Sequence, residues 1–272
     1  MERALRPEPL PDADAGLFGP ASVAWRIHRD PSLVVGGMRA LLVQALKPRV
    51  MAAVDQHSPF RYDFWGRINR TGEYIMVTTF GTSEEALRIS KRVRAEHRRI
   101  SGVDPVTGSH YSASDPELLL WVHAAEVDSF LAGYRAYGGN LTPTEATAYV
   151  AEMVTAAELV GLHPLEVPAS TEELSQYLDS QDDLALTKPA REGLRLLLDP
   201  PLPPLLVPLW RLVTTATVAI LPQYARELYG LQWPSLLTPP LRSAVRTAVT
   251  ALRAARPGPP HARAARQRTG GH

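Results

Sequence analysis

The sequence predicts an all-α fold, a single helical domain with a central buried helix pair. Apolar residues recur at helical spacing along most of the chain, and capping sequences precede several of these segments. We find neither a β-hairpin signal nor an internal repeat. We expect residues 1–15 to be a disordered N-terminal segment, residues 16–252 to form the helical domain, and residues 253–272 to be a disordered tail rich in Arg, Pro and Gly.

Prolines, capping threonines and glycines indicate where the expected helices begin and end. Pro48 should end or kink the first long helix near Lys47. Thr82 and Thr142 each precede a glutamate by three residues, which is a capping box, and Gly102 is a plausible stop. Residues 60–81 fit a frayed helix or a short extended segment. The expected helices span residues 31–58, 60–81, 82–101, 117–139, 142–162, 169–181, 187–198, 205–221, 222–230 and 239–255.

The composition excludes several classes of protein. The formal net charge is +1, so no strong global field attracts nucleic acid. The chain has no cysteine, which rules out disulfides, thiolate nucleophiles and Cys-based metal sites and is consistent with a cytoplasmic location. Pro208 and Arg211 interrupt the longest apolar stretch, residues 203–222, so we expect a buried helix there and no integral membrane span. A peripheral membrane contact is the less favoured alternative.

His97 is the most informative candidate residue. On a helical wheel it falls on an apolar stripe formed by Ala86, Ile89, Val93, His97 and Ile100. The basic residues of the same helix surround it, which argues against a nucleic-acid interface. A buried imidazole needs a hydrogen-bond partner or a metal. Two interpretations therefore stay open from the helix alone: a core histidine bonded to a backbone carbonyl, and an axial ligand to haem iron.

Two further groups are candidates for a site. His123 and Glu126 are three residues apart on the helix expected at the centre of the core, where they form either a structural polar pair or a metal or proton-relay pair. Arg67, Arg70 and Thr71 project from one side of another helix. They are either exposed polar residues or a fixed cation and hydroxyl that face an anionic group.

A set of segments in fixed order identifies a family resemblance. They are "GLFGPASVAWRIHRDPSLVVGGMRALLVQALKP", "DQHSPF", "GRINRT", "FGTSEEALRISKRVRAEHRRISG", "YSASDPELLLWVHAAEVDSFLAGY" and "LPQYARELYGLQWP". Together they resemble the rubber oxygenase (latex clearing protein) catalytic domains, a family that includes the ER-bound oxygenase MpaB. The resemblance covers about Gly16 to Trp233.

The resemblance implies an all-helical domain around a haem b pocket. Rubber-cleaving members hold haem through a histidine in an Arg-x-x-His context, which corresponds to Arg94 and His97. The family's upstream Arg-x-x-Lys-Thr motif corresponds to Arg67, Arg70 and Thr71, so Arg70 replaces the lysine. Arginine ligates iron poorly, and an open distal site is therefore expected.

The same resemblance implies roles for these residues. His97 would be the metal ligand, Arg70 and Arg94 would contact the cofactor, and Arg67 and Thr71 would bond a haem propionate or polarise O2. The family also has an upstream acidic residue, for which Asp55 and Asp63 are nearby candidates.

We therefore expect a haem b-dependent oxygenase or oxidase that acts with O2 on a small or medium apolar organic molecule. One alternative is a non-haem metal enzyme that uses His97, His123 and Glu126. The other is a non-catalytic helical ligand-binding protein of the same fold.

Overall fold

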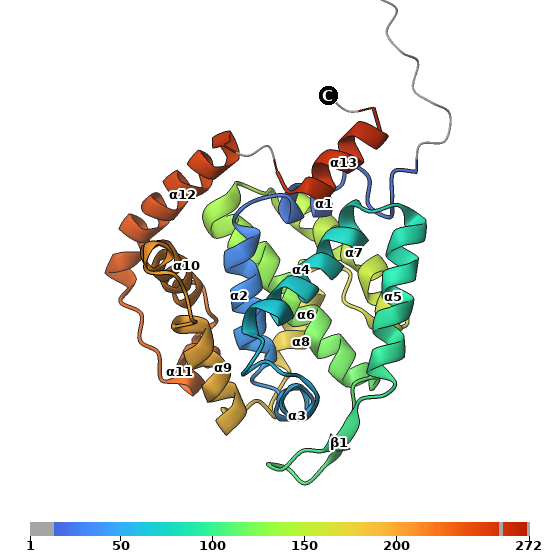
Figure 1. The fold of residues 1–272 in the computed structure, drawn as a ribbon, viewed down its shortest axis with the longest axis vertical. Helices are drawn as coiled ribbons and strands as arrows, with labels where there is room; N and C mark the ends of the chain where they lie inside the picture. Colours follow the sequence, from blue (N-terminus) through green and yellow to red (C-terminus); the bar gives the residue numbers. More distant parts are fainter. Residues whose placement is uncertain (1–13, 256–257, 271–272) are drawn as a thin grey trace, which may run out of the picture.

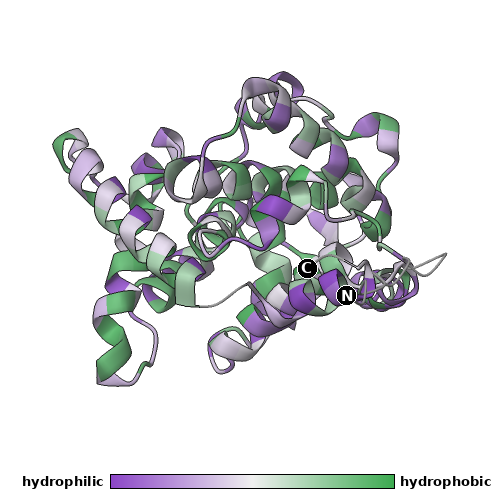
Figure 2. Ribbon diagram, turned by 90° about the horizontal axis from the view of Figure 1, so that it is seen from above, coloured by the Kyte–Doolittle hydropathy of each residue, from purple (hydrophilic) through white to green (hydrophobic). Residues whose placement is uncertain are grey.

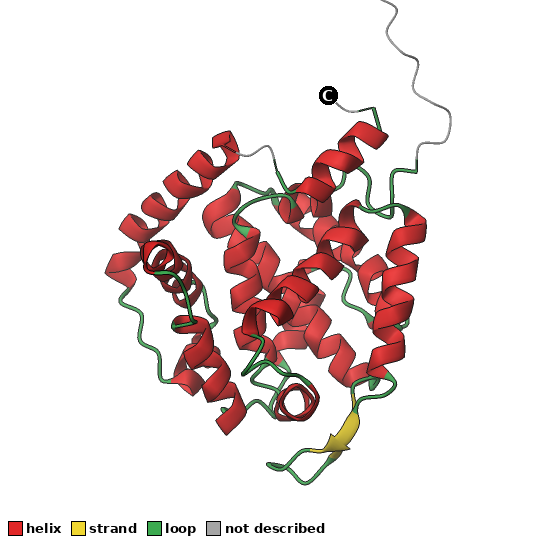
Figure 3. Cartoon of the chain, viewed as in Figure 1, coloured by secondary structure: helices red, strands yellow, loops and turns green. Residues whose placement is uncertain are grey.

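The computed structural model describes residues 14–255 and 258–270, and within these ranges the chain is all-α (Figure 1, Figure 3). A single two-stranded hairpin accompanies thirteen α-helices in this part of the chain. The α-helices are α1 (Val23–His28), α2 (Leu33–Gln44), α3 (Pro48–His57), α4 (Phe64–Phe80), α5 (Ser83–His97), α6 (Pro116–Gly133), α7 (Pro143–Val160), α8 (Thr171–Asp179), α9 (Lys188–Leu198), α10 (Val207–Ala219), α11 (Gln223–Tyr229), α12 (Thr238–Ala255) and α13 (Pro260–Arg268). The remaining elements are the strands β1 (Ser101–Val103) and β2 (His110–Ser112), the π-helical turn η1 (Tyr134–Gly138) and the 3₁₀ turns η2 (Pro164–Glu166), η3 (Pro204–Leu206) and η4 (Ser235–Leu237).

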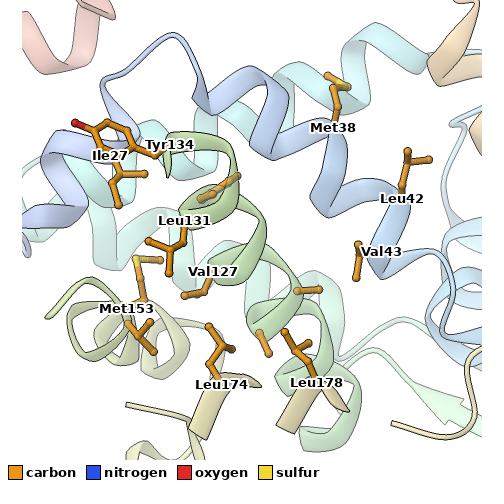
Figure 4. Packing of buried hydrophobic residues seen from close by; sticks show 14 of the residues in the cluster. Ile27, Met38, Leu42, Val43, Val127, Leu131, Tyr134, Met153, Leu174 and Leu178 are labelled. Atoms are coloured by element: carbon orange, nitrogen blue, oxygen red, sulfur yellow. The ribbon is translucent and has the colours of Figure 1, made fainter. Parts of the chain in front are cut away.

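Helices α2 and α6 form a central pair, and they pack more extensively than any other pair in the described ranges. Helix α6 is apolar on nearly every side, which suits a helix surrounded by other helices. Figure 4 shows its side chains between those of α2 on one side and those of α7 and α8 on the other. The buried residues labelled there from these four helices are Met38, Leu42, Val43, Val127, Leu131, Met153, Leu174 and Leu178.

Two glycines let α2 and α6 approach closely. A Cβ added at Gly36 would lie 2.9 Å from the Ser129 carbonyl oxygen, and one added at Gly133 would lie 2.9 Å from the Gly36 Cα. Polar side chains then tie the two helices together. The Trp121 Nε1 donates to the Gln44 carbonyl at 3.2 Å, and the Gln44 Nε2 donates to the Val122 carbonyl at 2.9 Å.

Most predicted helices are confirmed, together with their capping. Both capping boxes form, with Thr82 paired to Glu85 and Thr142 paired to Glu145. Pro48 is the first residue of α3, so the predicted break near Lys47 separates α2 from α3.

Figure 2 shows hydrophobic residues along the inner helices and also on the outer helices at its left edge.

The hairpin contradicts the expectation that the chain has no β-hairpin and that Gly102 stops a helix. Helix α5 ends at His97, and Gly102 pairs with Tyr111 in the hairpin. The strands have three residues each, too few for an alternating pattern to be recognised in the sequence. The Asp104 carboxylate stabilises the turn by accepting hydrogen bonds from the backbone of Val106 and Thr107.

The C-terminal tail is also more ordered than the sequence predicts. Residues 260–268 form helix α13, in which Ala262 and Ala265 pack on Trp25 and Phe80. The Arg268 guanidinium donates to the backbone carbonyls of Asp14 and Phe80. The small alanine side chains allow α13 to lie close to Trp25 and Phe80. Two alanines alone are too weak a sequence pattern to predict a buried helix face. The expected disorder of residues 1–13, 256–257 and 271–272 lies outside the described residues.

In the described ranges no single helix has the length and apolar composition needed to cross a bilayer. Only the bent pair Pro204–Ala219 and Gln223–Tyr229, which meet at 116°, satisfies those two criteria together.

Substitution of Gly36 by alanine should destabilise the protein by about 1–3 kcal/mol, because the new methyl group would overlap the α6 backbone. Chemical denaturation monitored by circular dichroism measures the change.

Gly193→Ala is the matched control, since Gly193 lies inside α9 with no atom within 4 Å of its added Cβ. There the helix preference of alanine should raise stability by about 0.5–1 kcal/mol. Equal effects at the two positions would contradict the close contact of α2 and α6.

Candidate active site

Helices α4 and α5 form an antiparallel pair that covers one side of α6. They meet at the short turn Gly81–Thr82 and diverge from it, with α6 behind them (Figure 1). Their backbones approach each other closely, and each comes close to the α6 backbone at few points at most. Side chains therefore fill much of the layer between α6 and these two helices.

Four polar side chains from three helices lie in this layer, and we call them the inner polar cluster: Tyr74, Ser90, Arg94 and Glu126. Tyr74 of α4 lies beside Ser90 of α5 and within electrostatic reach of Glu126 and Arg94. Burial raises the pKa of Tyr74 to about 12. The Ser90 hydroxyl lies close enough to lower this pKa, but it does not meet the geometry of a full hydrogen bond to Tyr74 in the described part of the chain. A buried hydroxyl without a well-formed hydrogen bond is costly.

Glu126 is the carboxylic acid of the inner polar cluster. Burial raises its pKa to about 7, and no ionic or hydrogen-bond partner among the described residues offsets that effect. Although Glu126 lies deep in the protein, its side chain keeps some accessible surface, so packed side chains do not enclose the carboxylate on every side. A carboxyl group that changes protonation near pH 7 suits general acid–base chemistry.

His97 is the last residue of α5, one helical turn after Arg94. Its Nδ1 is buried and has no hydrogen-bond partner among the residues that the structure describes. Burial lowers the pKa of His97, so the imidazole is neutral at pH 7. The side chain of Arg94 passes the C-terminal end of α7, where its Cδ would lie 3.7 Å from a Cβ added at Gly161. The core-histidine interpretation required a carbonyl partner for His97, and Nδ1 has none in this structure.

His123 lies one turn before Glu126 on α6 and is 9% exposed. Burial lowers its pKa to about 4, so it is also neutral at pH 7. Residues 14–255 and 258–270 contain no group of three His, Asp or Glu side chains arranged to hold one metal ion. The alternative in which His97, His123 and Glu126 share a non-haem iron is therefore not supported.

A hydrogen-bonded chain continues the polar layer toward α1. The His28 Nδ1 lies 2.7 Å from the Thr79 Oγ1, and the His28 Nε2 lies 3.1 Å from the Tyr149 hydroxyl. Burial lowers the pKa of His28 to about 3 and raises that of Tyr149, which Glu126 also raises through its charge. These three residues link α1, α4 and α7 beside Glu126.

Arg67, Arg70 and Thr71 lie on the first two turns of α4, and their hydrogen bonds in the described structure are local. The Arg67 Nη1 donates to the Ser58 Oγ at 2.9 Å, and burial lowers the pKa of Arg67. Arg70 is exposed and pairs with Asp63 at 2.9 Å, while the Thr71 hydroxyl donates to the Arg67 carbonyl. The predicted roles of these residues toward a cofactor stay predictions.

The sequence did not identify Tyr74, Ser90, Tyr149 or His28 as members of a site. None of the four belongs to a recognisable sequence motif. Only the packing of the helices brings Tyr74 and Tyr149 near Glu126, with Ser90 beside Tyr74 and His28 beside Tyr149. Two surface hollows of about 330 and 350 Å³ lie away from this layer. The first is lined by Lys47 and Glu117 and the second by residues of α12.

Buried titratable groups with shifted pKa values beside the central helix are more typical of an enzyme than of a structural bundle. The chain matches the sequence model of the ER-bound oxygenase mpaB/B'/Rubber oxygenase catalytic domain over residues 25–255. The chain belongs to this family.

Two curated relatives are similar to part of the chain. Uncharacterized protein Mb2261 of Mycobacterium bovis and Uncharacterized protein Rv2237 of Mycobacterium tuberculosis are each 30% identical over 148 residues. The match covers 52% of this chain and 55% of each relative, so the chain spans about half the length of the curated relatives it matches. No solved structure matches the chain.

Glu126→Gln should stabilise the protein at pH 7 and above. The folded pKa of about 7 exceeds the ordinary 4.5, so the unfolded state releases this proton first as pH rises. Wild-type stability is therefore unaffected by Glu126 below pH 4.5, falls between pH 4.5 and 7, and stays lowered above pH 7. Because the carboxylate keeps some accessible surface, we expect a gain of about 2 kcal/mol in the variant, measured by denaturation across this pH range.

Glu158→Gln on the exposed face of α7 is the control and should leave the pH profile unchanged. A Glu126→Gln profile parallel to that of the wild type would show that this carboxyl group titrates normally.

Proposed function

We propose that this protein is a haem b-dependent oxygenase or oxidase that acts with O2 on a small or medium apolar organic molecule, with His97 as the axial ligand. The observation that carries the proposal is the buried Nδ1 of His97, which has no hydrogen-bond partner in the described structure. Burial lowers the pKa of this imidazole and keeps it neutral, the state that ligates iron. When bound, haem iron supplies the reaction with O2.

The donor set fits haem better than an ion held by protein alone. A porphyrin provides four nitrogen ligands, so one histidine from the chain is sufficient. A structural or non-haem site needs three or more side chains, and the described residues hold no such group.

The inner polar cluster supplies groups that can hold a proton. Glu126 can hold or release a proton near pH 7, and Tyr74 offers a buried hydroxyl within electrostatic reach of Glu126. Arg94 supplies a fixed positive charge one turn from His97, suited to a propionate or another anion. Arg67, Arg70 and Thr71 remain proposed contacts at the start of α4, on the family pattern.

The test is a visible absorption spectrum of the purified chain after reconstitution with haemin. We expect a Soret band in the wild type and its loss or a clear shift in His97→Ala, because the iron loses its protein ligand. Added imidazole should restore the band position by replacing the missing side chain.

His110→Ala is the matched control, since His110 is exposed on β2, and it should retain the wild-type spectrum. Far-ultraviolet circular dichroism checks that both variants remain helical. Absence of a Soret band in the wild type, or an unchanged band in His97→Ala, would overturn the proposal.

The reconstituted, reduced protein should also bind carbon monoxide. Arg70 stands where the family has lysine, and it is exposed and paired with Asp63, so it does not compete for the distal position. A reduced spectrum that carbon monoxide leaves unchanged would indicate that another side chain occupies that position.

A further inference from the structure

The net charge of +1 conceals a strong separation of charge along the chain. All 28 acidic residues precede residue 228, so residues 1–227 carry 22 basic and 28 acidic side chains. Residues 228–272 contain no acid and seven arginines: Arg242, Arg246, Arg253, Arg256, Arg263, Arg266 and Arg268. A segment whose charges are all of one sign creates a local positive field that the net charge of the whole chain does not reveal.

The structure places α12, which carries three of these arginines, on the outside of the helical domain. Helix α12 lies at the edge of the molecule beside α10 (Figure 1). It buries Val245 and Val249 and half-buries Leu241 against α10 and η1. Arg242 and Ser243 are exposed on another side of the same helix.

Three of the arginines are bound within the fold, mostly to groups that carry no charge. The Arg246 guanidinium donates to the backbone carbonyls of Ala136 and Arg135. Arg268 likewise donates to carbonyls, and only Arg253 has an acidic partner, Asp30. Because carbonyls do not neutralise a guanidinium, the positive charge of the segment remains available at the surface.

An apolar protrusion precedes α12. The side chains of Leu236 and Leu237 in η4 are 87% and 50% exposed. A hollow of about 350 Å³ lies directly after them, lined by Thr238, Pro239, Arg242, Ser243 and Arg246. Exposed leucines, hydroxyl groups and two guanidinium groups thus adjoin one another, and no carboxylate lines the hollow.

We propose that η4 and the first half of α12 form a docking surface for an anionic lipid bilayer. Leu236 and Leu237 enter the boundary between headgroups and acyl chains, and Arg242 and Arg246 bind lipid phosphates in the adjoining hollow. The charge of the segment complements an anionic membrane, and apolar residues beside basic ones are typical of helices that lie in the interface. Exposed leucines contribute nothing to phosphate contacts on a nucleic acid, which makes a bilayer the favoured partner.

The experiment is co-sedimentation of the full chain with phosphatidylcholine vesicles that contain or lack phosphatidylglycerol. We expect binding only with phosphatidylglycerol, and weaker binding as salt increases. Arg242→Glu should reduce the bound fraction by at least about tenfold, because it replaces an attracted charge with a repelled one. The double substitution Leu236→Ser and Leu237→Ser should also weaken binding, whereas the salt dependence should persist because the arginines remain.

Two controls separate this surface from general effects. Arg92→Glu makes the same charge change at an exposed position of α5, and Leu165→Ser removes a leucine that is 90% exposed in η2. Both should bind vesicles like the wild type, and unchanged circular dichroism shows that each variant is folded.

Several results would overturn the proposal. They are equal binding to vesicles without phosphatidylglycerol, equal loss in the controls, and binding to a DNA duplex with none to vesicles. Sedimentation velocity provides another test. If the chain self-associates and the Leu236 and Leu237 substitutions abolish that association, the leucines form a contact between two copies of the chain. None of these measurements depends on haem, so they test the surface separately from the proposed function.

Discussion

The rest of the fold depends on the close approach of α2 and α6. Gly36 and Gly133 allow the two backbones to meet, and Arg39 then fixes their position. The Arg39 side chain is almost fully buried and binds Asp128 at 2.7 Å, the Ser129 Oγ at 2.6 Å and the Ile220 carbonyl at 2.9 Å. One guanidinium thus joins α2, α6 and the end of α10. This arrangement requires accurate placement of all three partners, and removing the Arg39 side chain would leave them unpaired at a cost in stability.

Because α6 is enclosed by other helices, every polar side chain on it must be bonded or carry a cost. Asp128 and Ser129 are bonded through Arg39, but burial shifts the pKa of His123 and Glu126 with no partner among the described residues to offset the shift. The difference separates two uses of polar residues on one helix. Asp128 and Ser129 hold the fold together, whereas burial of His123 and Glu126 disfavours their charged forms, as is common in sites that perform chemistry.

The sequence predicts what local physical chemistry determines. Capping at Thr82 and Thr142, the break at Pro48 and the all-α class follow from neighbouring residues alone. The apolar stripe on α5 also predicts that His97 faces inward. Tyr74 and Ser90 could not be predicted, because they belong to the site only through the antiparallel packing of α4 on α5.

Arginine content shows why sequence composition alone misleads about surfaces. The sum over the chain is nearly neutral, and it suggests no anionic partner. The distribution is different, because residues 228–272 contain seven arginines and no acid, and the described ones lie on α12 and α13. Those used in packing bind mainly carbonyl oxygens, as Arg246 and Arg268 do, so they stabilise the fold without losing their charge. A guanidinium can therefore hold α12 or α13 in place and still contribute to the field that an anionic surface meets.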